Sequence, residues 1–337
     1  MSGVKPGIPE IASLAPIGGE GRGEGKIPTK AIAVAPPSIG NVAVGFDVLG
    51  HSVQGSGDRV TVTRTTDGRV TIKAIRGIAE QLPLDAESNT AGRALLGLLP
   101  HAPAGTGFEV EIDKGIALGS GMGGSAASAV AAVVAANALL PRPVGLSTLY
   151  ELSMEGEAAA SGSKHGDNAG PMLLGGLVIA PAKGAPVRVP VPDWLHVALV
   201  HPHVVLETRR SRAALKGAYE LHDFVVQSEG LALLLAGCFT SDALLIRRGF
   251  RDVLVEPRRA PLIPQFAKVK QAALDCGALG SSISGGGPSV FAWFEDRATA
   301  ERAAGEMSLA FKEAGIESDG LVSPVAGPKA EVISCDA

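Results

Sequence analysis

Residues 115–137 read GIALGSGMGGSAASAVAAVVAAN, a glycine-dense turn that leads directly into an alanine-rich segment. The segment carries no charged side chain before Arg142, and its alanines favour a helix. The first amide groups of a helix have no partner within the helix and lie at the positive end of its dipole, and glycines let an anion approach them closely. The stretch therefore predicts a phosphate-binding loop before a buried helix. A tight turn that only enters a buried helix is the simpler alternative.

The same stretch satisfies the dinucleotide-binding pattern G-x-G-x-x-G through Gly119, Gly121 and Gly124. That fold requires an acidic residue about 20 positions further on, to bind the ribose hydroxyls. No Asp or Glu occurs between Ser125 and Tyr150, and the chain contains no G-x-x-x-x-G-K-[ST] pattern of a P-loop. A phosphate site is thus predicted outside both of these common phosphate-binding folds.

Composition narrows the class of protein. A chain of 337 residues with 46% hydrophobic residues is expected to form about two domains with a substantial core. The net charge of −4 and the small number of Trp and Tyr residues, two of each, give no support for nucleic-acid binding. The longest uncharged apolar run, near residues 126–140, is shorter than the roughly 20 residues of a membrane-spanning helix.

Three widely spaced cysteines without a metal-binding pattern, and no signal-peptide pattern, lead us to expect a reduced, cytoplasmic protein. Residues 1–29, rich in Gly and Pro, are expected to be a flexible extension.

Hydrophobic periodicity predicts a mixture of strands and helices that do not alternate strictly, which favours an α+β fold. Asp67-Gly68 predicts a two-residue hairpin between the strands at 59–66 and 69–75. Further strands are expected at 30–35, 108–112, 176–180, 187–191 and 195–200, with a last one at 320–326. Helices are expected at 89–99, 146–160, 211–219, 228–235 and 297–314, and the proline-rich residues 190–194 are the expected boundary between two halves.

Three separated stretches carry a family resemblance: APPSIGNVAVGFD at 35–47, GSGMGGSAAS at 119–128 and SSISGGGPS at 281–289. Together they resemble the signature motifs of the GHMP small-molecule kinases. The stretches GEAAASGSKHGDNAGPMLLGG at 156–176, ETRRSR at 207–212 and EPRR at 256–259 are similar to those of the homoserine kinases within that superfamily. The resemblance extends from residue 30 to the C-terminus.

The resemblance implies a two-domain α+β fold, with a ribosomal-protein-like β-α domain at residues 30–190 that binds ATP and a ferredoxin-like domain at residues 191–337. It implies ATP-dependent phosphorylation of the L-homoserine hydroxyl to O-phospho-L-homoserine, in threonine biosynthesis, by a cytoplasmic homodimer that uses Mg²⁺. In this fold the 281–289 turn is expected to pack against the glycine loop.

Site residues follow from the same resemblance. The positions that match the ATP site are Asn89, Gly115, Ile116, Ala117, Leu118, Gly119, Ser120, Gly121, Met122, Gly123, Gly124 and Ser125. Ser125 and Glu157 match the magnesium ligands. The positions that match the amino-acid site are Asn41, Asp47, His165, Arg212 and Arg259. A zwitterionic amino acid needs cations for its carboxylate and an anion for its ammonium group, which the two arginines and Asp47 provide. Asn89 would equally suit a helix N-cap.

The chain departs from the superfamily pattern where many relatives carry a lysine and a catalytic aspartate. Ser38 stands at the lysine position and Asn168 at the base position, so catalysis is predicted to depend on alignment and charge neutralisation, with Asn168 holding the substrate hydroxyl. Asp167 beside it remains an alternative base. Gly124 also replaces a serine of the phosphate loop. Another GHMP kinase for a different small alcohol, a catalytically inactive ligand-binding member and an oxidoreductase remain the alternative functions.

Overall fold

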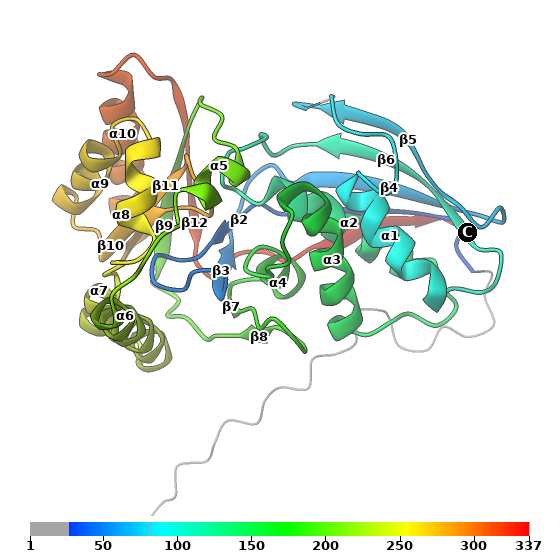
Figure 1. The fold of residues 1–337 in the computed structure, drawn as a ribbon, viewed down its shortest axis with the longest axis horizontal. Coiled ribbons are helices and arrows are strands. Elements are labelled where there is room, and N and C mark those ends of the chain that lie inside the picture. Colours follow the sequence, from blue (N-terminus) through cyan, green and yellow to red (C-terminus); the bar gives the residue numbers. More distant parts are fainter. Residues whose placement is uncertain (1–26, 80, 337) are drawn as a thin grey trace, which may run out of the picture.

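The computed structural model describes residues 27–79 and 81–336, which form two lobes lying side by side (Figure 1). The flexible extension expected at residues 1–29 falls almost entirely outside the described residues. One lobe is built mainly from the first half of the chain and the other from the second half. A small sheet lies between them, in the order β2 (Ser38–Gly40), β3 (Leu49–Ser52), β7 (Leu177–Ile179) and β8 (Val187–Arg188).

The first lobe contains a five-stranded sheet. Its strands lie in the order β13 (Glu331–Asp336), β1 (Lys30–Ala35), β4 (Asp58–Thr65), β6 (Gly107–Lys114) and β5 (Val70–Gly77). Small and branched residues at alternate positions of β1, β4 and β6 are buried. The helices α1 (Thr90–Leu98), α2 (Gly124–Ala138) and α3 (Leu146–Ser161) belong to the same lobe, and residues of all three share one hydrophobic core with the sheet.

The expected hairpin at Asp67-Gly68 is wrong, because β4 and β5 do not pair. Asp67 does reverse the chain, since its Oδ1 accepts hydrogen bonds from Thr65 Oγ1 at 2.6 Å and from Arg69 N at 3.2 Å. However, the chain crosses over through α1 and brings β6 between them, antiparallel to β4 and parallel to β5. Strand β6 buries Phe108, Val110 and Ile112, so the more apolar strand occupies the interior of the sheet and β5 its edge.

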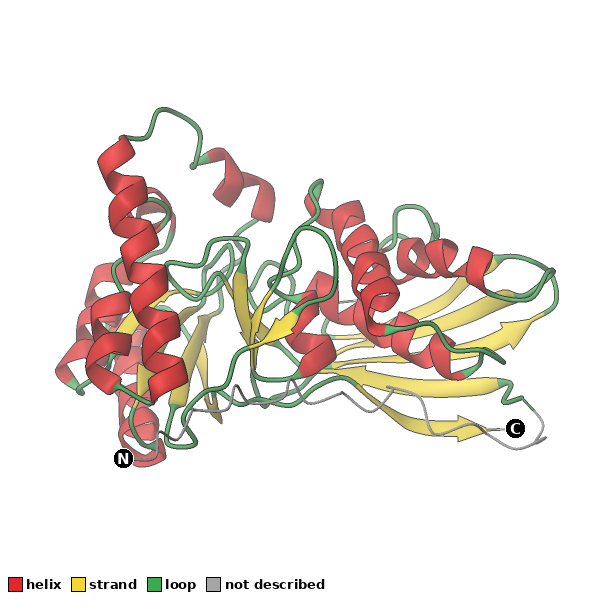
Figure 2. Ribbon diagram, turned by 90° about the horizontal axis from the view of Figure 1, so that it is seen from below, coloured by secondary structure: helices red, strands yellow, loops and turns green. Residues whose placement is uncertain are grey.

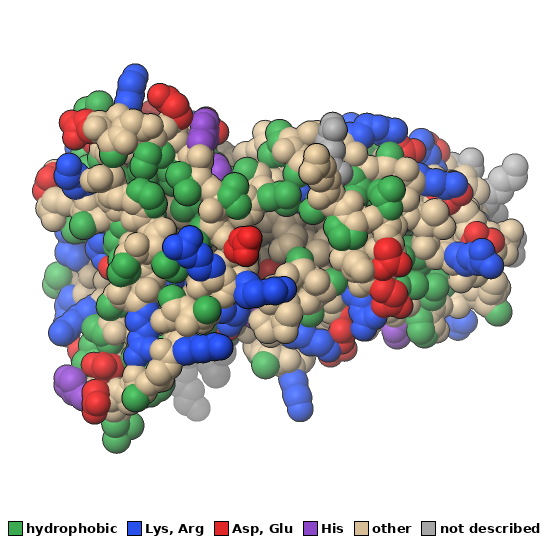
Figure 3. All heavy atoms as spheres, turned by 45° about the horizontal axis from the view of Figure 1, so that its top comes forward, with side chains coloured by type: hydrophobic (Ala, Val, Ile, Leu, Met, Phe, Trp, Pro, Cys, Tyr) green, Lys and Arg blue, Asp and Glu red, His purple; other side chains and the backbone are tan. Residues whose placement is uncertain are grey.

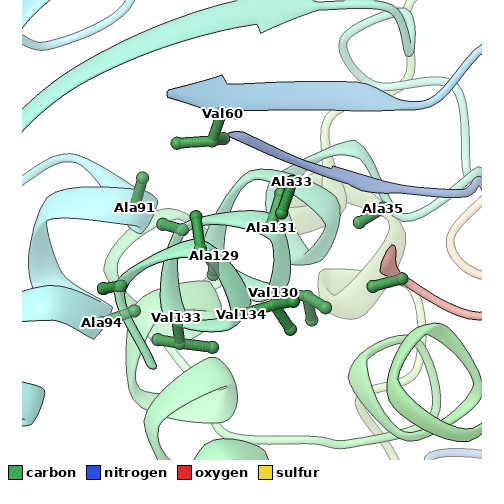
Figure 4. Packing of buried hydrophobic residues seen from close by; sticks show 14 of the residues in the cluster. Ala33, Ala35, Val60, Ala91, Ala94, Ala129, Val130, Ala131, Val133 and Val134 are labelled. Carbon is green, nitrogen blue, oxygen red and sulfur yellow. The ribbon is translucent and has the colours of Figure 1, made fainter. Parts of the chain in front are cut away.

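Helix α2 runs through the middle of this core. Every residue from Ala126 to Asn137 is buried. Because its side chains are mostly alanines, β1 and β4 pack closely on one side of the helix and α1 on the other. Figure 4 shows Ala33 of β1, Val60 of β4 and Ala91 of α1 around the helix. A helix made of such small residues can be surrounded on all sides, and this fixes the position of its N-terminus.

The second lobe contains an antiparallel sheet in the order β10 (Gly280–Ile283), β11 (Val290–Phe294), β9 (His196–Pro202) and β12 (Ser318–Pro324). Strand β9 is buried on both faces. Ala198 and Val200 pack with residues of α9 (Phe266–Asp275) and α10 (Arg297–Lys312). Val197 and Leu199 pack with residues of α6 (Leu221–Thr240), α7 (Ala243–Gly249) and the small sheet. Figure 2 shows the helices of this lobe gathered around its sheet.

Most of the other expected elements are present, with four differences. The helix expected at 211–219 is the shorter α5 (Thr208–Ala213), and the one expected at 228–235 is part of the longer α6. The strand expected to be the last, at 320–326, is β12, and it is followed by β13, which pairs antiparallel with β1 in the first lobe. Four helices were not expected, namely α4 (Ala169–Leu174), α7, α8 (Glu256–Arg259) and α9. Helices α4 and α8 are too short to show a helical period.

Helix α6 is long and apolar enough to cross a membrane by length and composition alone. In the structure 28% of that stretch is buried. Helices of globular proteins also meet these criteria of length and composition, so α6 alone is weak evidence for a membrane-spanning helix.

Candidate active site

A cavity of about 620 Å³ lies between the two lobes. Its wall is formed by the glycine loop, the start of α2, the end of α3, α5, α8 and the turn between β10 and β11. The space-filling view in Figure 3 shows the surface hollowed between the lobes, with acidic and basic side chains at the rim.

The glycine loop, residues 115–123, connects β6 to α2, as the sequence predicts. Gly119, Gly121 and Gly123 have φ values of 61°, 77° and 72°, a left-handed conformation that side chains rarely adopt. Gly123 is the N-cap of α2, and among the described residues no side chain caps this helix. Gly124 and Ser125 line the cavity. The loop therefore presents the uncapped N-terminus of a buried helix to the cavity, which is an anion-binding arrangement.

The turn between β10 and β11 packs against this loop, as expected. Ser284 Oγ donates to the carbonyl oxygen of Gly121 at 2.7 Å, and Ser289 Oγ donates to that of Ser120 at 2.6 Å. A β-carbon placed on Gly121 would lie 2.4 Å from the carbonyl oxygen of Ser284. The second lobe therefore holds the loop in a single conformation.

A buried ion pair fixes the other side of the loop. Lys114 Nζ donates to Asp58, to the carbonyl oxygen of Gly124 at 2.7 Å and to Ser128 Oγ at 2.9 Å. Asp58 Oδ1 accepts the amide of Gly115 at 3.0 Å. The sequence analysis missed Lys114, although it continues the buried phase of the alternation in β6.

At the opposite end of the cavity Asp47 faces Arg212. Arg212 Nη1 and Nη2 donate to the two carboxylate oxygens of Asp47 at 3.1 and 2.8 Å. The guanidinium groups of Arg212 and Arg259 lie 5.5 and 5.2 Å from the centre of the Phe46 ring. Burial lowers the pKa of Arg259 to about 10. This end therefore combines a carboxylate with two cations, as recognition of a zwitterion requires.

Asn41 holds the loop that carries Asp47. Its Oδ1 accepts the amide of Asp47 at 3.0 Å, and its Nδ2 donates to the carbonyl oxygen of Gly285 at 2.8 Å. Its own amide donates to Asp167 Oδ2 at 3.0 Å. Asn41 thus lines the cavity, and both polar atoms of its side chain form hydrogen bonds with the protein backbone.

Four polar residues form the floor between the two ends. Asn168 Oδ1 accepts a hydrogen bond from Ser38 Oγ at 2.8 Å. His165 Nδ1 lies 3.8 Å from Glu157 Oε1 and 3.7 Å from Asp167 Oδ1. Among the described residues, Glu157 Oε2 and both ring nitrogens of His165 have no hydrogen-bond partner despite their burial. Such orphaned groups are expected where a ligand completes the site.

Burial determines the protonation of these groups. Burial, together with the nearby Asp167 and Asp47 carboxylates, raises the pKa of Glu157 well above its usual value. Burial, and next the charge of Asp47, raises the pKa of Asp167 to about 7. The pKa of His165 is lowered, again mainly by burial. A carboxyl group with a raised pKa in the folded state stabilises the fold while it is protonated, and this stability is lost as the pH rises.

The contribution of Asp167 to the stability of the free protein should therefore decrease between pH 5 and pH 8. For Asp167 the loss occurs between its ordinary pKa of 3.8 and about 7. We expect Asp167→Asn to raise Tm by roughly 3–6 °C at pH 8 and by clearly less at pH 5, where only the first part of this loss has occurred. The exposed Asp193→Asn is the control. Thermal unfolding at both pH values measures the difference, and an equal effect of Asp167→Asn at both would contradict a titrating Asp167.

Most of the predicted site residues line this one cavity. The exceptions are Gly115, Ile116 and Met122, which support the loop from behind. Asn89 also lines the cavity and is the N-cap of α1, where its Oδ1 accepts the amides of Ala91 and Gly92. The sequence analysis missed several other lining residues, namely Leu82, Pro83, Thr90, Lys114, Val205, Glu207, Thr208 and Arg209.

Comparisons with known proteins agree with this arrangement. The family model of the N-terminal domain of GHMP kinases matches residues 89–176, and the model of the C-terminal domain of GHMP kinases matches residues 232–313. The fold is that of a GHMP kinase, an ATP-dependent enzyme that phosphorylates a small molecule.

The chain is 57% identical over 305 residues to a homoserine kinase of Xanthomonas campestris pv. campestris (strain B100), covering 90% of this chain and 94% of that protein. A homoserine kinase of Chlorobium phaeobacteroides (strain DSM 266) is 43% identical, with 89% and 98% covered. The crystal structure of homoserine kinase from Cytophaga hutchinsonii superposes with a TM-score of 0.87 at 39% identity, covering 93% of this chain and all of that one. The chain belongs to the homoserine kinase family. The predicted family and the α+β fold class are thereby confirmed.

Proposed function

We propose that the protein transfers the γ-phosphoryl group of ATP to the side-chain hydroxyl of L-homoserine, forming O-phospho-L-homoserine for threonine biosynthesis. One observation carries the proposal. A single cavity joins the uncapped N-terminus of α2 to the charged group of Asp47, Arg212 and Arg259. The family membership and the names of the relatives support the choice of substrate.

The charged end suits a small amino acid. In the free protein Asp47 and Arg212 satisfy each other through two hydrogen bonds. The carboxylate of the substrate replaces Asp47 at Arg212 and also interacts with Arg259, while Asp47 receives the ammonium group. His165, whose ring nitrogens have no hydrogen-bond partner in the part of the chain that the structure describes, completes the polar wall. Binding thus replaces the pair of Asp47 and Arg212 by two pairs, one between the substrate carboxylate and the arginines and one between its ammonium group and Asp47. No buried charge is left without a partner when the site is occupied.

The glycine loop accepts the triphosphate of ATP. The amides at the start of α2 donate to phosphate oxygens, and Lys114 holds the carbonyl oxygen of Gly124 so that the first turn cannot shift. Residues 115–125 form this part of the site. The cavity extends from there to Leu82, Pro83 and Asn89, which gives space for the adenine.

The donor set next to this loop suits magnesium. A buried carboxylate oxygen of Glu157 without a partner among the described residues, and the hydroxyl of Ser125, line the same cavity. Oxygen ligands beside phosphates are those that Mg²⁺ prefers. When bound there, the ion supplies charge neutralisation to the phosphate oxygens.

Asn168 holds the substrate hydroxyl in line with the γ-phosphorus. Its Oδ1 accepts from Ser38, which fixes the orientation of the amide. The hydroxyl oxygen forms the new bond to the γ-phosphorus, the bond from that phosphorus to the β–γ bridging oxygen breaks, and the hydroxyl proton passes to a phosphate oxygen. A neutral amide cannot accept this proton, so its contribution is alignment, which a loose phosphoryl-transfer transition state allows.

A coupled assay of ADP release tests the activity. L-homoserine should support turnover, whereas L-threonine, galactose and mevalonate should give rates at least about 100-fold lower, because each leaves part of the charged or polar wall unpaired or does not fit. Turnover with another alcohol but not with L-homoserine would identify a different GHMP kinase. Absence of turnover with every alcohol would indicate a ligand-binding member.

Glu157→Gln tests the magnesium assignment. Loss of the charged ligand should raise the half-saturating free Mg²⁺ concentration by about tenfold or more, at constant saturating ATP. Glu155→Gln, on the same helix but half-exposed and paired with Lys164, is the control and should leave the Mg²⁺ dependence unchanged. Identical Mg²⁺ titrations for both variants would remove Glu157 from the metal site.

The proposal includes a cytoplasmic homodimer, as the family resemblance implies. The exposed apolar side chains of α6, including Leu221 and Phe239 with 79% and 60% of their surfaces exposed, support association. Light scattering measures the mass in solution, and a mass of a single chain at micromolar concentration would contradict the dimer.

A further inference from the structure

A segment between the lobes carries Arg212 across the cavity. We name residues 203–220 the strap; it connects β9 to α6 and contains α5. Near its start, the amide of Leu206 donates to the carbonyl oxygen of Gly119 at 3.2 Å. A β-carbon on Gly119 would lie 2.9 Å from Val205 Cγ1. The strap is therefore held at this end by the glycine loop.

The far end of the strap is held by Arg258. Its guanidinium Nη1 donates to the carbonyl oxygen of Lys216 at 2.9 Å, with a longer contact to that of Leu215 at 3.4 Å. Its Nη2 donates to the carbonyl oxygen of Ala218 at 2.5 Å. The guanidinium carbon also lies 3.8 Å from the centre of the Tyr219 ring. A single side chain thus binds backbone at three positions and one aromatic face in the residues that directly follow α5.

The helix that carries Arg258 is itself firmly anchored. The carboxylate of Asp252 accepts the amides of Val255 and Glu256, both at 2.9 Å. Glu256 accepts from Ser282 Oγ at 2.6 Å and pairs with Lys270. Helix α8 therefore provides a fixed point on the second lobe.

Consecutive arginines of α8 have different environments. Arg259 is buried, lines the cavity and donates to the carbonyl oxygen of Gly285 at 2.8 Å. Arg258 points to the strap. Helix α5, which carries Arg212, lies between the two anchored ends of the strap.

We propose that Arg258 is a positioning residue for the amino-acid end of the site: by holding residues 215–219 against α8, it places Arg212 opposite Asp47 and Arg259. The inference rests on the proposed function for its substrate. Arg258 contributes no group to the substrate itself. Its effect reaches the reaction through Arg212 and is therefore specific for the amino acid, whereas the ATP end is held independently by Leu206 and Gly119.

Arg258→Met should raise KM for L-homoserine about tenfold while kcat and KM for ATP change less than about threefold. Arg258→Lys should not restore the low KM, since one ammonium group cannot reproduce a planar fork that binds several carbonyl oxygens and stacks on a ring. Tyr219→Ala removes the aromatic face with Arg258 intact, and it should give an intermediate rise. Arg248→Met, an exposed arginine on α7, is the matched control.

A second measurement does not depend on the substrate. Limited trypsin digestion of the full-length protein should cleave after Lys216 faster in Arg258→Met than in Arg248→Met, at equal Tm. Faster cleavage together with the selective rise of KM supports the proposal. Unchanged cleavage, restoration by lysine, or equal rises of KM for both substrates would overturn it. If Arg258→Met does not fold, the proposal is tested with Tyr219→Ala, by KM for L-homoserine and by the rate of cleavage after Lys216. Absence of any turnover with L-homoserine in the unsubstituted protein would refute the proposed function, while the cleavage result would still test the strap.

Discussion

Gly121→Ala should reduce the affinity for ATP by at least about 100-fold, a loss comparable to that of a catalytic hydrogen-bond donor. Gly121 has a φ of 77°, and its β-carbon would meet the carbonyl oxygens of Ser284 and Gly287 at 2.4 and 2.8 Å. Relief of this clash requires the glycine loop to move away from the second lobe, which displaces the amides at the start of α2. Calorimetric titration with a non-hydrolysable ATP analogue measures the effect.

Gly184→Ala separates this clash from backbone strain. Gly184 has a φ of 85°, and a β-carbon there meets no atom of the described residues within 4 Å. In both variants an alanine in a left-handed position should cost about 1–2 kcal/mol of folding stability, and in Gly121→Ala the clash adds to this loss. Only Gly121→Ala should lose ATP binding. Undiminished affinity in Gly121→Ala would contradict phosphate binding by this loop.

Asn168→Ala should lower kcat by about 100-fold or more and change the affinity for ATP less than threefold, since misplacement of a reacting group alone costs about this much. The alanine no longer holds the substrate hydroxyl, whereas the glycine loop is unaffected. Single-turnover kinetics together with ATP titration separate the two quantities. Unchanged turnover would remove Asn168 from the mechanism.

Two further variants test the neighbours of Asn168. Ser38→Ala removes the hydrogen bond to Asn168 Oδ1 and should reduce kcat by less than about tenfold, because the amide remains present. Asp167→Asn addresses the alternative base. If Asp167 accepted the proton, its pKa of about 7 would appear as an acidic limb in the pH profile of kcat/KM, and this limb would disappear in Asp167→Asn.

The sequence predicts the fold where local signals are strong. The glycine loop, the buried α2 and the alternation in β6 are local patterns, and the structure confirms them. The strand order around β5 is not a local property. Asp67 correctly indicates a turn, but the partner of β4 depends on which later strand buries more apolar surface, and β6 does so.

The residues of the candidate site could be predicted where the charge of the side chain itself indicates what it binds. Asp47, Arg212 and Arg259 form the charged end although they are distant in the sequence. Lys114 and Arg258 were not identified, because their roles come from carbonyl groups of other segments. Which backbone carbonyl groups lie near a side chain depends on the fold and cannot be read from the sequence. Asn89 caps helix α1 in the structure, and its contact with adenine stays a prediction.

The last strand, β13, has a consequence for synthesis of the chain. It pairs with β1, so Lys30 finds its partner Asp336 about 300 residues later. The nascent first lobe thus leaves the ribosome with the outer edge of its sheet exposed, and this edge is covered only after β13 has been synthesised. The sheet of the lobe that is synthesised first is therefore completed late. Between the synthesis of β1 and that of β13, the open edge of β1 has to be protected from pairing with other strands.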